Sequence, residues 1–394
     1  MTSTLGIKKI QYPNGTNSIT IDSSGSADIT TANITTAAIT TANVTNATAT
    51  GTITTPSING GQIGGRRNIV INGAMQVAQR GTSVASITSG AYRTADRMYL
   101  NMGTAGTWTN TVSTDVPTGQ GFAKSFKLDC TTANGSLSAG SYMTLQHRIE
   151  AQNIQYLKKG TANAESLTLS FWVKSAKTGT YIAYLKDEDN NRDISKSYTI
   201  SSANTWEKKT ITFPPDTTGA LNNDNGIGLY IYFWLVAGST YLNANSGSLQ
   251  TTWATSANSA AGQVNLADST SNDWYITGIQ LEAGSQATEF EHRSFAEELQ
   301  LCSRYFWRQY NSGTNAIYFR DNISAAGQNI LYQFPAPPAM RINGATVTCS
   351  LTANVSVNSN TLTYHQHGAI QVYLASISGD NYLYSQDLSI NAEL

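Results

Sequence analysis

The sequence predicts an all-β protein with a short repetitive N-terminal shaft, an antiparallel jelly-roll sandwich, one connecting helix and a C-terminal β-sandwich tip. Three observations predict this fold class. An apolar residue recurs every five positions near the N-terminus, short strands separated by Gly, Asn and Pro turns fill most of the remainder, and one segment alone has helical periodicity. We expect three copies of the chain to form a homotrimer.

The composition excludes several classes of partner. The chain has 394 residues, of which 12% are charged, and its net charge is −1. Ordinary globular domains are about 25% charged. Without a basic field we expect no nucleic-acid partner. Since no apolar stretch reaches the roughly 18 residues of a membrane span, we expect no membrane insertion. The N-terminus lacks the apolar run of a signal peptide, so secretory export is not expected either.

Three cysteines lie far apart in the sequence, at Cys130, Cys302 and Cys349. An odd number of widely spaced cysteines builds neither a disulfide framework nor a CxxC metal site. We therefore expect buried free thiols.

Residues 29–65 carry the repeat, whose units read ADITT, ANITT, AAITT and ANVTN. These units resemble the consensus of a single-chain pentapeptide β-helix. Four good units make about one coil, which is fewer than the roughly three stacked units that a solenoid needs. We therefore expect a trimeric shaft, with a flexible Thr/Ala-rich linker as the alternative and a Gly-rich hinge over residues 60–65. The predicted trimer-axis residues are Ile29, Ile34, Ile39, Val44, Ile53, Ile58 and Ile63.

Residues 66–293 read as the jelly roll. The alternation of LTLSFWVK predicts a strand over 167–174. Further strands are expected over 180–186, 194–200, 205–213, 228–236 and 273–281.

A helix is expected over residues 294–310. It begins at the capping box Ser294-Phe295-Ala296-Glu297. Phe295, Leu299, Cys302 and Phe306 would lie on one apolar face. The last segment, 311–394, returns to strands, expected over 316–320, 329–334, 346–355, 361–364, 369–377 and 382–385.

Several segments resemble bacteriophage tail-fibre and related virion structural proteins. They are RNIVINGAMQVAQRGT (67–82), YRTADRM (92–98), ITGIQLEAG (276–284) followed by TEFE (288–291), EELQLCSRYF (297–306), and the FP and MR pairs at 334–335 and 340–341. The resemblance implies a carbohydrate-binding-module-like jelly roll, a β-rich tip and a trimer on the exterior of a virion. It transfers no catalytic residue. Residues 1–28 would then attach the fibre to another tail or baseplate protein.

Two segments are candidate metal sites. Residues 187–193 place oxygen side chains at alternate positions, but Arg192 stands where an EF-hand needs Gly, so a solvated hairpin loop is favoured. A calcium site built from several loops stays open, at no position that the sequence identifies. His365 and His367 are favoured as exposed strand-end residues, although in a trimer three such pairs could surround one metal ion. No cofactor is expected.

We expect no enzymatic activity. The sequence has no nucleophile elbow, phosphate loop or HExxH helix. Glu282 with Glu289, or Asp216 with Asp224, could form a glycosidase pair, but spacing in the sequence does not fix the carboxyl separation that this chemistry needs.

Aromatic residues indicate a function more clearly than the acidic residues do. The chain has 7 Trp and 20 Tyr against 10 Phe, and Tyr and Trp combine an apolar ring with a hydrogen-bonding edge. Such rings suit the C–H faces of sugars. The candidate glycan contacts, in or beside turn-rich segments, are Tyr241, Trp253, Tyr382 and Tyr384.

We therefore expect a receptor-binding fibre that adsorbs to a bacterial surface polysaccharide without cleaving it. Two alternatives stay open: a capsid or tail decoration protein with no receptor of its own, and a capsule-depolymerising spike.

Overall fold

The computed structural model describes side chains for residues 66–309, 340–341, 345–346 and 388–394; in the strands outside these ranges it describes the backbone alone. The chain divides into two compact units, Met1–Thr55 and Pro56–Leu394. In the first unit, β1 (Lys9–Gln11), β2 (Asn17–Ile21) and β3 (Ala27–Asp28) form an antiparallel sheet. Outside the described residues lie the predicted axis residues Ile29, Ile34, Ile39, Val44, Ile53, Ile58 and Ile63.

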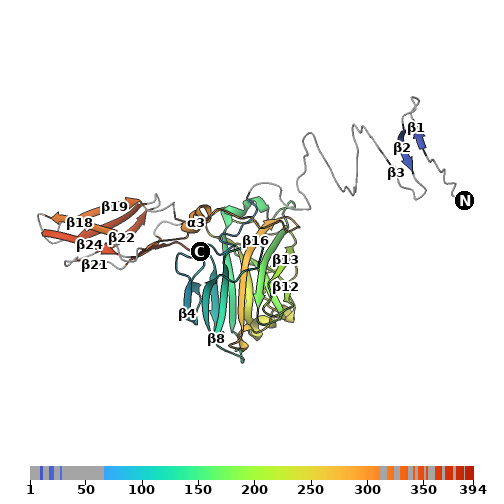
Figure 1. The fold of residues 1–394 in the computed structure, drawn as a ribbon, viewed down its shortest axis with the longest axis horizontal. Coiled ribbons are helices and arrows are strands. Elements are labelled where there is room, and N and C mark those ends of the chain that lie inside the picture. Colours follow the sequence, from blue (N-terminus) through green and yellow to red (C-terminus); the bar gives the residue numbers. More distant parts are fainter. Residues whose placement is uncertain are drawn as a thin grey trace. The chain divides into compact units, whose positions relative to one another are not determined.

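Two antiparallel sheets form the body of the second unit (Figure 1). The six-stranded sheet has the order β13-β10-β16-β8-β7-β4, and the seven-stranded sheet has the order β15-β12-β11-β14-β9-β6-β5. This sandwich confirms the predicted all-β class. The strands of the first sheet are β4 (Ser83–Ile87), β7 (Thr107–Ser113), β8 (Ser125–Thr132), β10 (Leu167–Ser175), β13 (Glu207–Phe213) and β16 (Asp273–Ala283). Those of the second are β5 (Ala91–Tyr92), β6 (Tyr99–Gly103), β9 (Tyr142–Glu150), β11 (Gly179–Asp187), β12 (Arg192–Ile200), β14 (Ile227–Ala237) and β15 (Ala254–Thr255).

Short helical turns lie in the connections between these strands. They are the 3₁₀ turns η1 (Ala151–Leu157) and η2 (Leu266–Asp268) and the single turns α1 (Ser239–Leu242) and α2 (Ala244–Gly247). None of the helices in the described part of the chain is long and apolar enough to cross a membrane.

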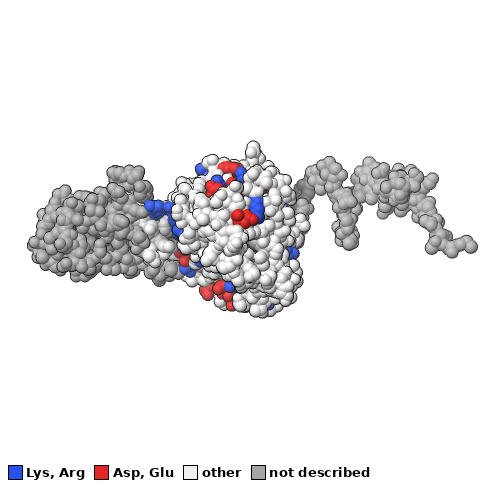
Figure 2. All heavy atoms as spheres, turned by 90° about the horizontal axis from the view of Figure 1, so that it is seen from below, with Lys and Arg blue, Asp and Glu red and all other residues white. Residues whose placement is uncertain are grey.

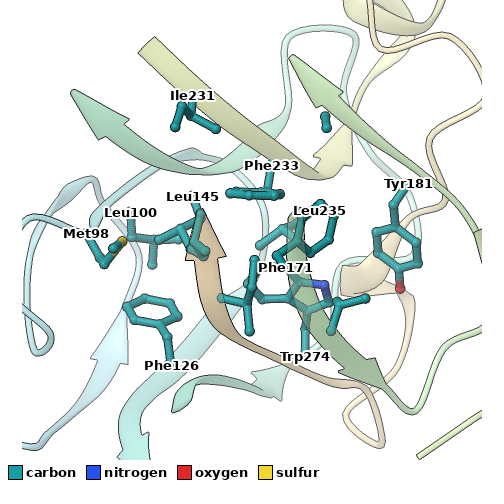
Figure 3. Packing of buried hydrophobic residues seen from close by; sticks show 14 of the residues in the cluster. Met98, Leu100, Phe126, Leu145, Phe171, Tyr181, Ile231, Phe233, Leu235 and Trp274 are labelled. Atoms are coloured by element: carbon teal, nitrogen blue, oxygen red, sulfur yellow. The ribbon is translucent and has the colours of Figure 1, made fainter. Parts of the chain in front are cut away.

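The core lies between the two sheets (Figure 3). Successive side chains of a strand point to opposite faces, so every second residue of each strand enters this layer. Phe171 of β10 meets Phe233 of β14 edge-on with ring centroids 4.9 Å apart, and the ring of Trp274 lies 6.3 Å from that of Phe233. Burying each such ring stabilises the fold by roughly 1.5–3 kcal/mol. Cys130 and Cys302 are buried free thiols, as expected.

The sequence motifs at 67–82 and 276–291 lie against each other at one end of the sandwich. The Asn68 amide donates to the Ile279 carbonyl at 3.1 Å and accepts from the Leu281 N–H at 3.2 Å. The Glu291 carboxylate accepts the backbone N–H groups of Arg67 and Asn68. These motif residues thus hold two distant segments of the chain together.

Asn72 joins the same end of the sandwich to a third motif. Its amide donates to the carbonyls of Val77 and Asp96 at 2.8 and 2.9 Å, and its oxygen accepts the Val77 N–H at 3.0 Å. The Asn72 N–H donates to the Glu298 carboxylate at 2.5 Å. The hydrogen bonds of Asn72 therefore join the segments 67–82, 92–98 and 297–306.

The connecting helix is shorter than predicted. α3 spans Phe295–Ser303, and Ser294 caps it by accepting the Glu297 N–H at 3.2 Å, as the capping box indicates. The predicted extension to residue 310 is wrong, because β17 (Phe306–Tyr310) instead pairs with β25 (Asp387–Asn391). The predicted apolar face is also only partly buried: Phe295 is 56% exposed.

The C-terminal segment is β-rich, as expected. β18 (Ile317–Ile323), β21 (Thr352–Ala353) and β24 (Gly379–Ser385) form one three-stranded sheet, and β19 (Asn329–Pro335), β22 (Asn360–His365) and β23 (Ala369–Ala375) form another. The single strand predicted over 346–355 is wrong, because β20 (Thr346–Cys349) pairs with β25 while β21 pairs with β24. All these pairings are antiparallel.

Candidate functional site

The outward side of the seven-stranded sheet carries a cluster of aromatic side chains. In β14, Leu229, Ile231 and Phe233 enter the core. The alternate residues Tyr230, Tyr232 and Trp234 therefore point away from it. β14 reads as a continuous apolar strand, yet three of its four rings point away from the core.

A row of polar and aromatic residues crosses four neighbouring strands of this side. Tyr232 of β14 is paired with Gln146 of β9, Gln146 with Tyr99 of β6, and Tyr99 with Tyr92 of β5. Directly paired residues lie on the same side of a sheet. Because neighbouring strands are about 4.8 Å apart, Tyr232 and Tyr99 are roughly 10 Å apart along the row.

The outward rings contact one another. The ring centroids of Tyr230 and Tyr232 are 5.2 Å apart, and those of Tyr92 and Tyr99 are 5.0 Å apart. Trp234 lies 5.0 Å from Tyr241, which follows β14 in α1. We call this surface the tyrosine face; its aromatic members are Tyr92, Tyr99, Tyr142, Tyr230, Tyr232, Trp234 and Tyr241.

Hydrogen-bonding groups lie among these rings. The Arg148 guanidinium sits 4.0 Å from the centroid of the Tyr99 ring and donates to Gln146 Oε1 at 3.3 Å. The Gln146 amide donates in turn to Thr144 Oγ1 at 3.1 Å. Arg148 also donates to the Leu394 carbonyl, which places the last residue of the chain at the edge of the face. The polar side chains are thereby held in fixed positions.

The hydroxyls of Tyr230 and Tyr92 remain protonated at neutral pH. Burial, reinforced by the Glu188 carboxylate, raises the pKa of Tyr230. Burial, with a smaller contribution from Glu393, raises the pKa of Tyr92 to about 12. A protonated phenol can both donate and accept a hydrogen bond.

The Trp234 indole N–H is an unsatisfied donor on this side of the sheet. Its Nε1–H is buried and has no hydrogen-bond partner within the described part of the chain. Buried donors without a partner are rare in folded proteins and call for an explanation. Trp234 is 5% exposed and packs in a small apolar cluster with Ile182, Tyr184, Ala237 and Ala260, so this donor is enclosed.

Of the four predicted glycan contacts, the structure places Tyr241 on the tyrosine face, 5.9 Å from the Tyr142 ring. Trp253 lies elsewhere, donating to the Pro214 carbonyl at 2.9 Å beside Lys159. Tyr382 and Tyr384 belong to β24, whose side chains are outside the described residues. Sequence reasoning missed Tyr230 and Tyr232, although their i, i+2 spacing with Trp234 was visible.

The acidic residues considered for catalysis are not paired with one another. The buried Glu282 carboxylate accepts from the Thr288 N–H and hydroxyl and from the Gln280 amide. The Asp216 carboxylate forms a bidentate ion pair with Arg192, and its pKa is lowered by hydrogen bonds from Arg192 and Lys159 that outweigh the effect of burial. The Glu282 and Asp216 carboxylates therefore stabilise the fold through these contacts.

The loop at 187–193 is a hairpin turn between β11 and β12, as favoured from the sequence. Its Asp187 forms an ion pair with Lys159. In the described ranges, no group of three or more His, Cys, Asp or Glu side chains is placed to hold a metal ion. His367 lies outside the described residues, as does the side chain of His365 at the end of β22.

Charged side chains form a few small clusters separated by uncharged surface on the side of the molecule seen in Figure 2. The low charge of the sequence is thus visible on the folded surface.

No protein-family model and no curated protein matches this chain. Solved structures with similar arrangements include the enzymatically active domain of tailspike protein 4 of bacteriophage CBA120, at 16% identity and a TM-score of 0.29; the match covers 55% of this chain and 21% of that one. A putative sugar-binding protein from Bacteroides thetaiotaomicron matches at 11% identity and a TM-score of 0.29, covering 55% of this chain and 100% of that one. A family 11 carbohydrate-binding module from Clostridium thermocellum matches at 13% identity and a TM-score of 0.25, covering 52% and 99%. Likeness at this level assigns the chain to no family.

Proposed function

We propose that the tyrosine face binds a bacterial surface polysaccharide without cleaving it. The observation that carries the proposal is the row Tyr232, Gln146, Tyr99 and Tyr92 across four strands. It sets a fixed amide between two flat rings, with a third ring beyond them. Sugar rings present apolar C–H faces and hydroxyl edges, which these two kinds of group complement.

The geometry of the row supports a chain-like ligand. Tyr232 and Tyr99 are about 10 Å apart, roughly the length of two linked sugar rings. The row runs across the outward side of the sheet to its edge strand β5, where the Tyr92 hydroxyl donates to the Leu394 carbonyl at 3.4 Å. The scarcity of charged residues, 12% of the chain, suits a ligand recognised mainly through hydroxyl groups.

We propose in addition that the chain is a receptor-binding fibre on the exterior of a bacteriophage virion, anchored to a tail or baseplate protein through residues 1–28. The support is the sequence resemblance at 67–82, 92–98, 276–291 and 297–306. In a homotrimer three tyrosine faces would act together, and multivalency turns weak single sites into firm adsorption.

Affinity electrophoresis in gels that contain purified bacterial polysaccharides tests the binding proposal. We expect the native chain to be retarded by at least one of them. The double variant Tyr230→Ala/Tyr232→Ala should lose at least tenfold in affinity, because about 1.4 kcal/mol is a factor of ten and stacked rings contribute on this scale.

The matched control is Tyr156→Ala, which removes a tyrosine that is 43% exposed and does not belong to the face. It should migrate as the native chain does. Equal retardation of the native chain and the double variant would rule out the tyrosine face as the site.

A further inference from the structure

A hollow lies on the outward side of the other, six-stranded sheet. Its cavity volume is about 130 Å³, and Phe122, Trp172, Lys208, Glu289, Phe290 and His292 line it. It therefore stands apart from the tyrosine face, with the core of the sandwich between them.

A bulge in the sheet creates the floor of this hollow. The pairing of β10 with β16 shifts between Ser170 and Trp172, and Gly278 in the shifted part of β16 has a φ of +62°. A Cβ atom on Gly278 would lie 2.6 Å from Cζ of Phe122. The missing side chain thus lets the Phe122 ring rest directly over the strand. Bulges of this kind re-aim side chains and are frequent beside functional sites.

Aromatic rings form the wall of the hollow. The ring centroids of Phe122, Phe290 and His292 are 4.9 to 5.4 Å from one another. Trp172 of β10 is half-buried and is paired across the sheet with Lys208 of β13. These rings give an apolar surface with a polar edge.

The polar side chains at the rim of the hollow have no partner in the described part of the chain. Among the residues that the structure describes, the side chains of Gln120, Lys208 and Glu289 form no hydrogen bond or ion pair. On the same side of the sheet, by contrast, the Lys127 and Lys174 ammonium groups are paired with Asp129 and Asp115. An amide, an ammonium and a carboxylate are therefore available to a ligand beside the aromatic wall.

We infer that this hollow binds a single sugar ring, such as a terminal or branch residue of a glycan. The rings would stack on the C–H face of the sugar, while Gln120, Lys208 and Glu289 would reach its hydroxyls. The volume is below the roughly 300–1,000 Å³ of pockets that enclose drug-sized ligands, so one ring fits and a chain does not. The site does not depend on the tyrosine face.

Saturation-transfer NMR on the full chain tests this inference, with methyl glycosides of glucose, galactose, mannose, rhamnose and N-acetylglucosamine as probes. The experiment is run in the Tyr230→Ala/Tyr232→Ala background, so that signal from the tyrosine face is removed. We expect at least one probe to bind with a dissociation constant of about 1 mM. Adding Trp172→Ala or Lys208→Ala should weaken it at least threefold, and Trp172→Phe should restore most of the signal.

Trp206→Ala is the matched control, since Trp206 is half-buried on the same sheet side but lies outside the hollow, bonded to Asp115. It should leave the signal unchanged. Lys208 is exposed, so its variant tests the site even if Trp172→Ala disturbs the fold. The inference fails if no probe gives saturation transfer, or if both hollow variants bind as strongly as the parent. Either failure leaves the polysaccharide result on the tyrosine face standing.

Discussion

Asp96 is fully buried. Gln79 donates to its carboxylate at 2.6 Å, and the Arg80 guanidinium lies 3.7 Å from the same carboxylate. Burial raises the pKa of Asp96 to about 6, against the opposing effect of Arg80. The unfolded value is near 3.9. Between these values the folded chain keeps a proton that the unfolded chain has released.

The stability that Asp96 contributes is therefore fully present below about pH 4 and is lost as the pH rises through about 6, by up to roughly 3 kcal/mol. Asp96→Asn should flatten the pH dependence of the free energy of unfolding in this window, as measured by urea denaturation at pH 4, 5, 6 and 7. An unchanged difference between pH 4 and pH 7 in the variant would contradict this account.

Residue-level prediction from the sequence was only partly successful at the candidate site. Tyr241 was found because it follows a strand at a turn. Tyr230 and Tyr232 were missed because β14 reads as uniformly apolar, and a sequence does not say which side of such a strand the sandwich leaves outside. Trp253 looked equally exposed, but its indole bonds to Pro214.

At the scale of elements, the strands of the sandwich from β10 to β16 were predicted best. β10 to β14 and β16 have long apolar runs or clean alternation, and their expected ranges agree with the structure within two residues. β7 is harder to predict from the sequence. Its three inward positions are Trp108, Asn110 and Val112, and the polar asparagine interrupts the apolar alternation. The helix end was missed for a different reason: β17 is a strand only because it pairs with β25, about eighty residues later.

The bulge in β16 predicts that this strand requires a glycine at position 278. Gly278→Ala would place a side chain at a φ of +62°, which costs about 1–2 kcal/mol, and would displace the Phe122 ring. We expect thermal unfolding to shift to lower temperature accordingly. Gly135→Ala is the control, because a Cβ there meets nothing within 4 Å. Equal melting temperatures for the two variants would show that the bulge does not require glycine.

For the whole molecule, the proposed homotrimer connects the repeat to adsorption. Seven apolar residues spaced along 29–63 would fill a shared axis while threonines face water. Native mass spectrometry should then give three times the 42.3 kDa chain mass. Replacing Ile34 and Ile39 by Asp should shift the protein toward the monomer, and a monomeric native chain would refute the shaft.

The central claim is that a polysaccharide lies along the tyrosine face. The most direct measurement is a crystal structure of the chain with an oligosaccharide fragment of a polysaccharide that retards it. We expect sugar rings over Tyr232 and Tyr99, with a hydroxyl bonded to Gln146. An oligosaccharide bound only away from this face would contradict the claim.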